Sequence, residues 1–270
     1  MDLHKIVGTG PGRRITKEDV LAYTGNPPPV EQEQSLAPQH PDEEIIAITG
    51  IRKVTFENIS KSVATAAQVT STTEVDLTEL IRLRQEILAG WERYHGVRPT
   101  LNAFFVKAVA LALREHPLLN SSVQGDRLVL KKYYHIGLAV TVGEDLVVPV
   151  VRHADSLSVL EIAKRIAVLV EKARQNALTP EDMSGGTFTI SNVGPYQVQV
   201  FTPVIVQPQN AILGIGATTQ RPVVRDGQIV IRDVANLCLT YDHRVIQGAS
   251  AARFRITLKD LLEHPLSLLG

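Results

Sequence analysis

YDHRVIQGA, residues 241–249, is the stretch on which the fold and chemistry of the rest of the chain depend. It places His243 after a strand-like run and Gln247 four positions later, where a helix begins. A histidine suits proton transfer near neutrality because its ordinary pKa of about 6.5 leaves it mostly neutral at pH 7. A thiol, whose ordinary pKa is about 8.5, needs such a base before it becomes a good nucleophile. His243 is therefore a candidate general base, although a lone histidine in a domain is more often structural.

Around this stretch, helical and strand patterns alternate from residue 45 to residue 270, which predicts an α/β (α+β) domain. Helices are expected over residues 51–68, 76–95, 100–116, 158–176 and 248–263, and strands over 134–142, 146–151, 187–192, 211–217, 222–224, 228–231 and 236–241. Asp76 with Glu79, and Ser158 with Glu161, have the spacing of capping boxes at helix starts. Turns at 143–145 and 226–227 indicate hairpins, and hence a mixed, largely antiparallel sheet.

The strand over residues 187–192 carries hydroxyls at alternate positions, Thr187, Thr189 and Ser191, so all three share one face. Taken alone, this alternation is typical of a polar strand face. It gives Ser191 no chemical role by itself.

The composition limits the partners and the compartment. Lys+Arg and Asp+Glu both number 28, so no overall field favours nucleic acid or a membrane surface, and we expect neither as a partner. The single Cys238 fits a reducing compartment, and the sequence shows no cluster of metal ligands, so no metal is expected. The N-terminus lacks a secretory signal, which predicts a cytoplasmic protein, or a mitochondrial matrix protein if the source is eukaryotic.

The N-terminal 44 residues differ from the rest. Residues 1–25 contain a glycine-rich loop and then a short helix, with Thr16 as its N-cap, Asp19 three residues on, and Gly25 at its end. A frayed terminus and a phosphate-binding loop are both alternatives, but no strand precedes the loop as a dinucleotide site requires. Residues 26–44 are rich in proline and acidic residues, which predicts an extended, semi-rigid linker and a domain boundary.

The N-terminal string GTGPGRRITKEDVLAY, residues 8–23, resembles the second half of the peripheral subunit-binding domain of 2-oxo acid dehydrogenase complexes. The resemblance implies a small module that docks the E1 and E3 components through arginines. Arg14 matches the arginine of the glycine loop, and Arg13 stands where glycine is usual. The family's first helix would lie before Met1, so residues 1–25 are expected to be a partial domain.

The C-terminal string YDHRVIQGASAARF, residues 241–254, resembles the Asp-His-Arg-x-x-Asp-Gly motif of the dihydrolipoamide acyltransferase (E2) catalytic domain. Further segments similar to this family occur in family order, namely IRKVTFENISKSV (51–63), VTSTTEVDLTEL (69–80), LVVPVVRHAD (146–155), GGTFTISNVG (185–194) and FTPVIVQPQNAILGIG (201–216). The resemblance covers residues 45–270, which we expect to form the catalytic domain.

This resemblance implies a chloramphenicol-acetyltransferase-like fold, homotrimers with active sites between subunits, and a larger E2 core built from trimers. It implies acyl transfer from a dihydrolipoyl group to the thiol of coenzyme A, with the lipoyl domain supplied by another chain or a missing domain. By position, His243 would be the general base and Ser191 the donor to the tetrahedral oxyanion. Asn192 and Asp242 would support them.

The chain departs from the family where Gln247 replaces the carboxylate four residues after the histidine. That carboxylate is expected to order the loop through an arginine, for which we propose Arg52. A neutral glutamine would leave a buried arginine unpaired, at a cost in stability. Two nearby segments, residues 195–197 and 206–208, also differ from the family pattern.

Three functions remain open from the sequence. The chain is an active E2-type acyltransferase, an E2-like structural core protein weakened by Gln247, or a stand-alone acyltransferase for a small molecule. The first is favoured because His243 and Ser191 are both present. The segment 69–75 is more similar to acetyl- or acetoin-type members than to succinyl ones, which favours acetyl as the acyl group.

Overall fold

The computed structural model describes residues 6–25 and 40–269, and its contacts divide the chain into two compact units, residues 1–48 and 49–270. The first unit contains helix α1 (Lys17–Gly25). A reciprocal capping box starts this helix: Asp19 N donates to Thr16 Oγ1 at 3.3 Å, and Thr16 N donates to Asp19 Oδ2 at 2.8 Å. Thr16 is thus confirmed as the N-cap. Most of the predicted linker, residues 26–44, lies outside the described residues.

The second unit consists of a main β-sheet, two small sheets and the helices that pack against them. Its helices are α2 (Gly50–Thr65), α3 (Thr78–His95), α4 (Leu101–Glu115), α5 (Val159–Arg174), α6 (Pro180–Met183) and α7 (Gly248–Glu263), and short 3-10 helices occupy Pro117–Leu119, Gly194–Tyr196 and Pro265–Leu268. Its strands are β1 (Gln68–Asp76), β2 (Ser121–Gln124), β3 (Arg127–Leu130), β4 (Ile136–Leu138), β5 (Val140–Val142), β6 (Asp145–Val147), β7 (Val150–Val151), β8 (Phe188–Asn192), β9 (Ala211–Ile215), β10 (Thr219–Arg225) and β11 (Gln228–Asp242). No helix in the described ranges is long and apolar enough to cross a membrane.

Seven strands form the main sheet, in the order β1-β11-β9-β8-β4-β7, with β10 paired to β11. The β4–β8 and β8–β9 pairs are parallel, and the other pairs are antiparallel. The hairpins β2–β3 and β5–β6 form two further small antiparallel sheets. The predicted mixed, largely antiparallel sheet is therefore confirmed.

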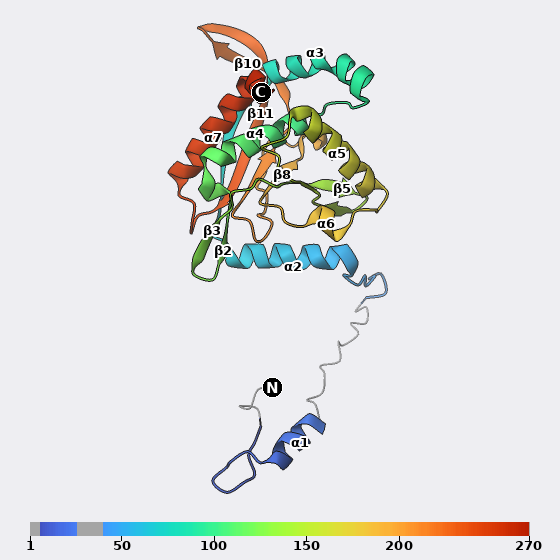
Figure 1. The fold of residues 1–270 in the computed structure, drawn as a ribbon, viewed down its shortest axis with the longest axis vertical. Coiled ribbons are helices and arrows are strands. Elements are labelled where there is room, and N and C mark those ends of the chain that lie inside the picture. Colours follow the sequence, from blue (N-terminus) through green and yellow to red (C-terminus); the bar gives the residue numbers. More distant parts are fainter. Residues whose placement is uncertain (1–5, 26–39, 270) are drawn as a thin grey trace. The chain divides into compact units, whose positions relative to one another are not determined.

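The two faces of the sheet differ in chemistry. Figure 1 shows α4, α5 and α7 over one face, with α4 packed against both of the others. Apolar side chains fill this layer, including Phe104, Phe105 and Phe254, all at most 1% exposed. Because side chains alternate along a strand, the opposite face receives the other residues, among them the hydroxyls of β8. Ser191, one of the candidate site residues, lies on that second face.

Four predicted local features are confirmed. The Ser158–Glu161 capping box forms and starts α5. The hairpin turn at 226–227 forms between β10 and β11, with φ of 52° and 75°. A hairpin also forms at 143–144, joining β5 to β6, although both strands are short. Helix α7 covers the predicted range 248–263.

Strand β11 differs from the prediction because it runs unbroken from Gln228 to Asp242, where two shorter strands were expected. The reason is a change of partner at Val234. Strand β10 pairs with β11 up to Val234, and β1 pairs with it from Val234 onwards, so hydrogen bonding continues through the predicted gap. The two strand patterns of the sequence are the two halves of one long strand.

The predicted start of α3 is also wrong. Its N-cap is Leu77, and the carboxylate of Asp76 instead accepts a hydrogen bond from Thr78 N at 3.0 Å. The same carboxylate lies 3.3 Å from Arg225 Nη2 and 3.6 Å from Arg232 Nε. These arginines come from the β10–β11 hairpin, whose approach the local sequence pattern could not predict.

Candidate active site

The loop carrying His243 connects β11 to α7 and is fixed by main-chain hydrogen bonds. His243 N donates to Ala67 O at 2.8 Å, which ties the loop to the residues between α2 and β1. Ile246 N donates to Asp242 O at 2.9 Å and closes the turn. The imidazole is half-buried, and its centroid lies 5.8 Å from that of the Tyr241 ring. Within the described residues its nitrogens form no hydrogen bond, so they are free to exchange a proton with a ligand.

The buried side chain of Asp242 stabilises this loop by accepting hydrogen bonds. It is 2% exposed, and Arg244 reaches back to it with Nη2 at 2.6 Å from Oδ2 and Nε at 3.0 Å from Oδ1. The backbone N–H groups of Arg244 and Ala67 also donate to Oδ1, at 3.1 and 3.3 Å. Burial alone would raise the pKa of Asp242, but the hydrogen bonds and charge of Arg244 outweigh it and hold the pKa below its ordinary value. The carboxylate is therefore ionised at neutral pH.

Ser191 lies on the polar face of β8. Within one chain it lies far from His243, the other residue expected to take part in catalysis. Its neighbours along the row are Gly214 and then Cys238, which is five residues before His243. At about 3.3 Å per strand residue, the Cα atoms of Ser191 and His243 are about 15 Å or more apart in one chain. The Ser191 hydroxyl makes no hydrogen bond to any described residue, whereas Thr189 Oγ1 donates to Gln209 Oε1 at 2.8 Å. Of these two hydroxyls, Ser191 is the one left available.

Asn192 orders the turn that follows Ser191. Its Nδ2 donates to Asn102 Oδ1 at 2.8 Å, and its Oδ1 accepts from Gly194 N at 2.9 Å. A cavity of about 490 Å³ opens beside these residues, lined also by Thr100 at the start of α4. A second cavity, of about 540 Å³, lies toward the histidine loop and is lined by residues that include Ala66, Gln68 and Thr240.

A side-chain network that sequence reasoning missed orders the loop beside the second cavity. Ser62, buried on α2, donates to Ile205 O at 2.6 Å and accepts from Gln68 Nε2 at 3.0 Å. Gln68 Oε1 accepts in turn from Ile205 N at 3.2 Å. Gln68 pairs with Asp242 in the β1–β11 register, so this network adjoins the histidine loop. The sequence did not distinguish Ser62, because α2 contains several other polar residues.

Within one chain, Arg52 lies away from the histidine loop that it was expected to order. Its Nε lies 3.8 Å from Asp145 Oδ1 in β6, and both side chains are about half exposed. Arg52 is in the first turn of α2, whereas the histidine loop meets the chain just after its last turn, about 20 Å away at 1.5 Å per residue. Gln247 is exposed, serves as the N-cap of α7 and makes no side-chain capping bond. Within the chain, Arg244 orders this loop through Asp242.

The described residues contain no group of three or more side chains suited to hold a metal ion. In the first unit, Arg13 and Arg14 are both exposed in the glycine loop, and Arg13 has a positive φ of 61°. Gly10 N donates to Arg14 O at 3.0 Å and closes that loop.

Comparison with known proteins identifies the family. Residues 40–270 match the catalytic domain of the 2-oxoacid dehydrogenases acyltransferase family, and residues 1–21 match the E3 binding domain. The chain belongs to this acyltransferase family. The family's function is acyl transfer between a lipoyl group and coenzyme A, and its members are E2 components of 2-oxoacid dehydrogenase complexes.

Two curated relatives illustrate the range within the acyltransferase family. The acetyltransferase component of the acetoin cleaving system of Bacillus subtilis is 39% identical over 269 residues, which cover 100% of this chain and 67% of that protein. The succinyltransferase component of the 2-oxoglutarate dehydrogenase complex of Rickettsia bellii is 40% identical over 271 residues, covering 100% and 68%. Identity alone therefore does not separate acetyl from succinyl members.

A solved structure of the family bears on the site residues. The dihydrolipoamide acetyltransferase of Azotobacter vinelandii is 38% identical, with a TM-score of 0.81, covering 85% of this chain and 95% of that one. It comes from investigations on the role of a serine, a histidine and an asparagine in the catalytic mechanism of that enzyme. The serine and histidine are separated by 52 residues and the histidine and asparagine by four, the same separations as Ser191, His243 and Gln247. The expected acyltransferase fold is confirmed.

Proposed function

We propose that the chain transfers an acyl group from a dihydrolipoyl thioester to the thiol of coenzyme A, in a site formed by two copies of the chain. His243 comes from one copy and Ser191 from the other. The separation of about 15 Å or more along one sheet supports this. Within one chain, the two side chains are too far apart to act together on one carbonyl group. The matching 52- and four-residue separations in the Azotobacter vinelandii enzyme are the observation that carries the proposal.

The chemistry then follows from two side chains. The neutral imidazole of His243 accepts the proton of the coenzyme A thiol as the sulfur attacks the thioester carbonyl. The Ser191 hydroxyl donates to the oxyanion of the tetrahedral intermediate, which is where negative charge develops. When the intermediate collapses, the imidazolium returns its proton to the departing dihydrolipoyl sulfur. No net proton is gained or lost, and His243 is neutral again.

The surface of α2 supports association of copies, and we propose a homotrimer as the basic unit of a larger core. Five large apolar side chains on this helix, Ile51, Val54, Phe56, Ile59 and Val63, are between 38% and 62% exposed. Only Ser62 on this helix is buried within the chain. An apolar surface of this extent is typical of an interface between subunits.

Mixing two inactive variants tests the shared site. His243→Ala and Ser191→Ala proteins are each expected to be inactive in transfer from acyl-dihydrolipoamide to coenzyme A. If they exchange subunits after mild dissociation, about one quarter of the sites regain both side chains, and activity returns in proportion. No recovery despite proven subunit exchange would count against the shared site. Activity of the unmodified protein no higher than His243→Ala would reject the enzyme altogether.

For the acyl group we propose acetyl, on the similarity of segment 69–75 to acetyl- and acetoin-type members. Transfer rates from acetyl, succinyl and isobutyryl dihydrolipoamide, compared at equal concentration, test this directly. A succinyl rate above the acetyl rate would reverse the assignment.

The alternative function is an E2-like structural core protein that turns over poorly because Gln247 replaces a carboxylate. The neutral asparagine at the corresponding separation in the Azotobacter vinelandii enzyme argues against this alternative. For residues 1–25 we propose docking of the E1 or E3 component, since Arg13 and Arg14 are exposed and the E3 binding domain matches here. A double Arg13→Ala, Arg14→Ala variant that bound both components unchanged would refute this role.

A further inference from the structure

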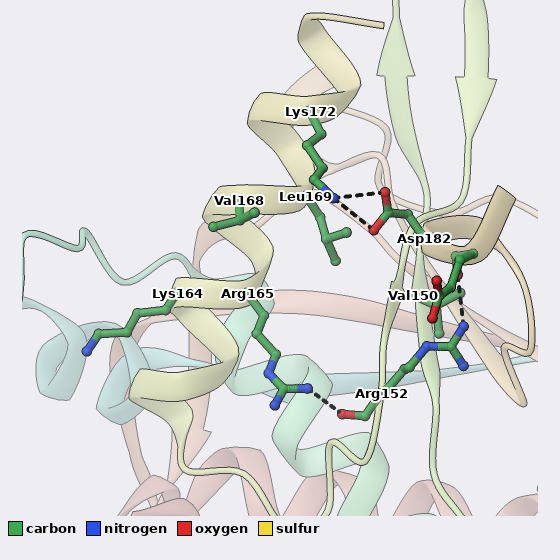
Figure 2. A pocket seen from close by; sticks show the side chains of 9 residues that line it. Val150, Arg152, Lys164, Arg165, Val168, Leu169, Lys172 and Asp182 are labelled. Atoms are coloured by element: carbon green, nitrogen blue, oxygen red, sulfur yellow. Dashed lines mark hydrogen bonds and ion pairs between the residues drawn. The ribbon is translucent and has the colours of Figure 1, made fainter. Parts of the chain in front are cut away.

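A hollow of about 350 Å³ lies between α5 and α6, and none of its lining residues belongs to the candidate active site. Figure 2 shows side chains of α5 along one side of it and those of Arg152 and Asp182 on the other. Part of its wall is apolar, formed by Val150, Val168 and Leu169. The remainder is charged, with four basic and two acidic side chains.

One basic side chain is neutralised within the chain. Lys172 Nζ lies 3.0 Å from Asp182 Oδ2 and 3.2 Å from Oδ1. Hydrogen bonds from Thr179 and Lys172 hold the pKa of Asp182 below its ordinary value, so the carboxylate is ionised. The Lys172–Asp182 pair therefore adds little net charge to the hollow.

The two arginines are held in place without being neutralised. Arg152 Nη2 donates to the carbonyl oxygens of Glu181 and Ser184, at 2.8 and 3.1 Å. Arg165 Nη1 donates to Arg152 O at 3.2 Å, as the dashed line in Figure 2 marks. Neither guanidinium forms an ion pair within the described ranges, and the same holds for Lys164. Carbonyl oxygens fix the position of a guanidinium but leave its full charge and its remaining N–H groups available.

The charge of the hollow is therefore positive. Arg152, Arg165 and Lys164 contribute three charges, which the Glu181 carboxylate reduces to about two. Glu161, one turn before Arg165, accepts hydrogen bonds in the capping box of α5, and Arg165 and Lys164 help to lower the pKa of its carboxyl group, so its charge offsets part of theirs. The hollow keeps a net positive charge, which an anionic ligand matches.

We propose that this hollow binds a small organic dianion, either a phosphate monoester or a dicarboxylate, with a short apolar portion. Guanidinium groups bind both kinds of oxyanion through paired N–H donors. The apolar wall takes the hydrocarbon part, and the volume falls within the range of small-molecule sites, about 300–1,000 Å³. The site is independent of acyl transfer, and its ligand differs from the acyl-group substrates.

Calorimetric titration of the full chain at low ionic strength and pH 8 tests the proposal. The probes are n-propyl phosphate and glutarate, which separate a phosphate source from a carboxylate source, with methyl phosphate to test the apolar wall. We expect saturable binding of one molecule per chain for at least one dianion. Each added methylene should tighten binding by about fourfold if it contacts the apolar wall.

Arg165→Gln is the decisive variant, because this exposed side chain forms one hydrogen bond, to Arg152 O, and its loss should not prevent folding. Losing a charged hydrogen-bonding partner should weaken binding by about tenfold or more. Arg174→Gln is the matched control, with the same charge change on α5 but nine positions away, about half a turn around the helix. Equal thermal transitions of the three proteins would show that each is folded.

Several outcomes would overturn the proposal. These are no saturable binding of either dianion, equal affinity in Arg165→Gln and the unmodified protein, or equal loss in Arg174→Gln. Binding of only one probe supports the proposal and identifies its source.

Discussion

Replacing Asp242 with asparagine tests how the histidine loop is held. The carboxylate, 2% exposed, accepts hydrogen bonds from the Arg244 guanidinium and from two backbone N–H groups. Asparagine keeps the shape but turns an NH₂ group toward this ring of donors. A hydrogen bond to a charged group contributes about 1.5–3 kcal/mol, and the ion-pair part is discounted because the Arg244 side chain is 48% exposed. We expect a loss of about 2–3 kcal/mol in the free energy of unfolding.

The same substitution should lower kcat more than it changes KM for coenzyme A. Asp242 positions His243 through the turn and touches no substrate, and a displacement of about 1 Å can cost about a hundredfold in rate. Asp226→Asn, in the exposed β10–β11 turn, is the control and should change neither quantity. Steady-state kinetics and urea unfolding of both variants give the answer. An Asp242→Asn protein with kcat within twofold of the unmodified chain would refute the positioning role.

The pH dependence of Asp242→Asn adds a second check. The folded pKa of Asp242 is lowered, so its stabilising effect is complete above the unfolded pKa of about 3.9. The effect is lost as the pH falls from there through the folded pKa. The difference in unfolding free energy between the two proteins should therefore be constant from pH 5 to 8 and shrink below about pH 4. A difference that grew with acidity would contradict this assignment.

Three further predictions concern other residues. Ser191→Ala should lower kcat by about 100- to 1,000-fold with an unchanged thermal transition, since its hydroxyl has no partner in the described part of the chain; a shifted transition would indicate a structural role. Gln247→Asp should stabilise the protein by about 0.5–1 kcal/mol in urea unfolding, because this N-cap makes no side-chain bond to α7 and aspartate caps well; no gain would mean that the side chain cannot reach the helix. Burial and then His153 lower the pKa of His135, so stability should fall as the pH drops below about 6.5, and His135→Gln should flatten that fall; an unchanged slope would refute the assignment.

Local signals in the sequence predicted much of the fold. The Ser158–Glu161 box and the turn at 226–227 depend on residues within a few positions of one another, and both are confirmed. The errors arise where distant segments meet. Strand β11 continues through the predicted gap because β10 pairs with it up to Val234, and β1, more than 150 residues earlier, pairs with it from there. Asp76 is not the N-cap of α3, and its carboxylate lies close to arginines of the β10–β11 hairpin.

The candidate site was harder to predict for the same reason. The resemblance assigned roles to His243 and Ser191, and no local pattern could have done so, since Ser191 looks like any other hydroxyl on a strand face. The role of Arg244 was missed although it lies next to the histidine. Its side chain folds back to a residue two positions earlier, a contact that spacing alone does not indicate.

The position of Arg52 changes the argument about Gln247. The case for an impaired enzyme depended on a buried arginine losing its carboxylate partner, which would be costly. Arg52 instead lies about half exposed beside Asp145, so within the chain a neutral residue at position 247 leaves no buried charge unpaired. The histidine loop keeps its own ion pair between Asp242 and Arg244, whatever occupies position 247. Within one chain, this removes the physical reason to expect a weak enzyme.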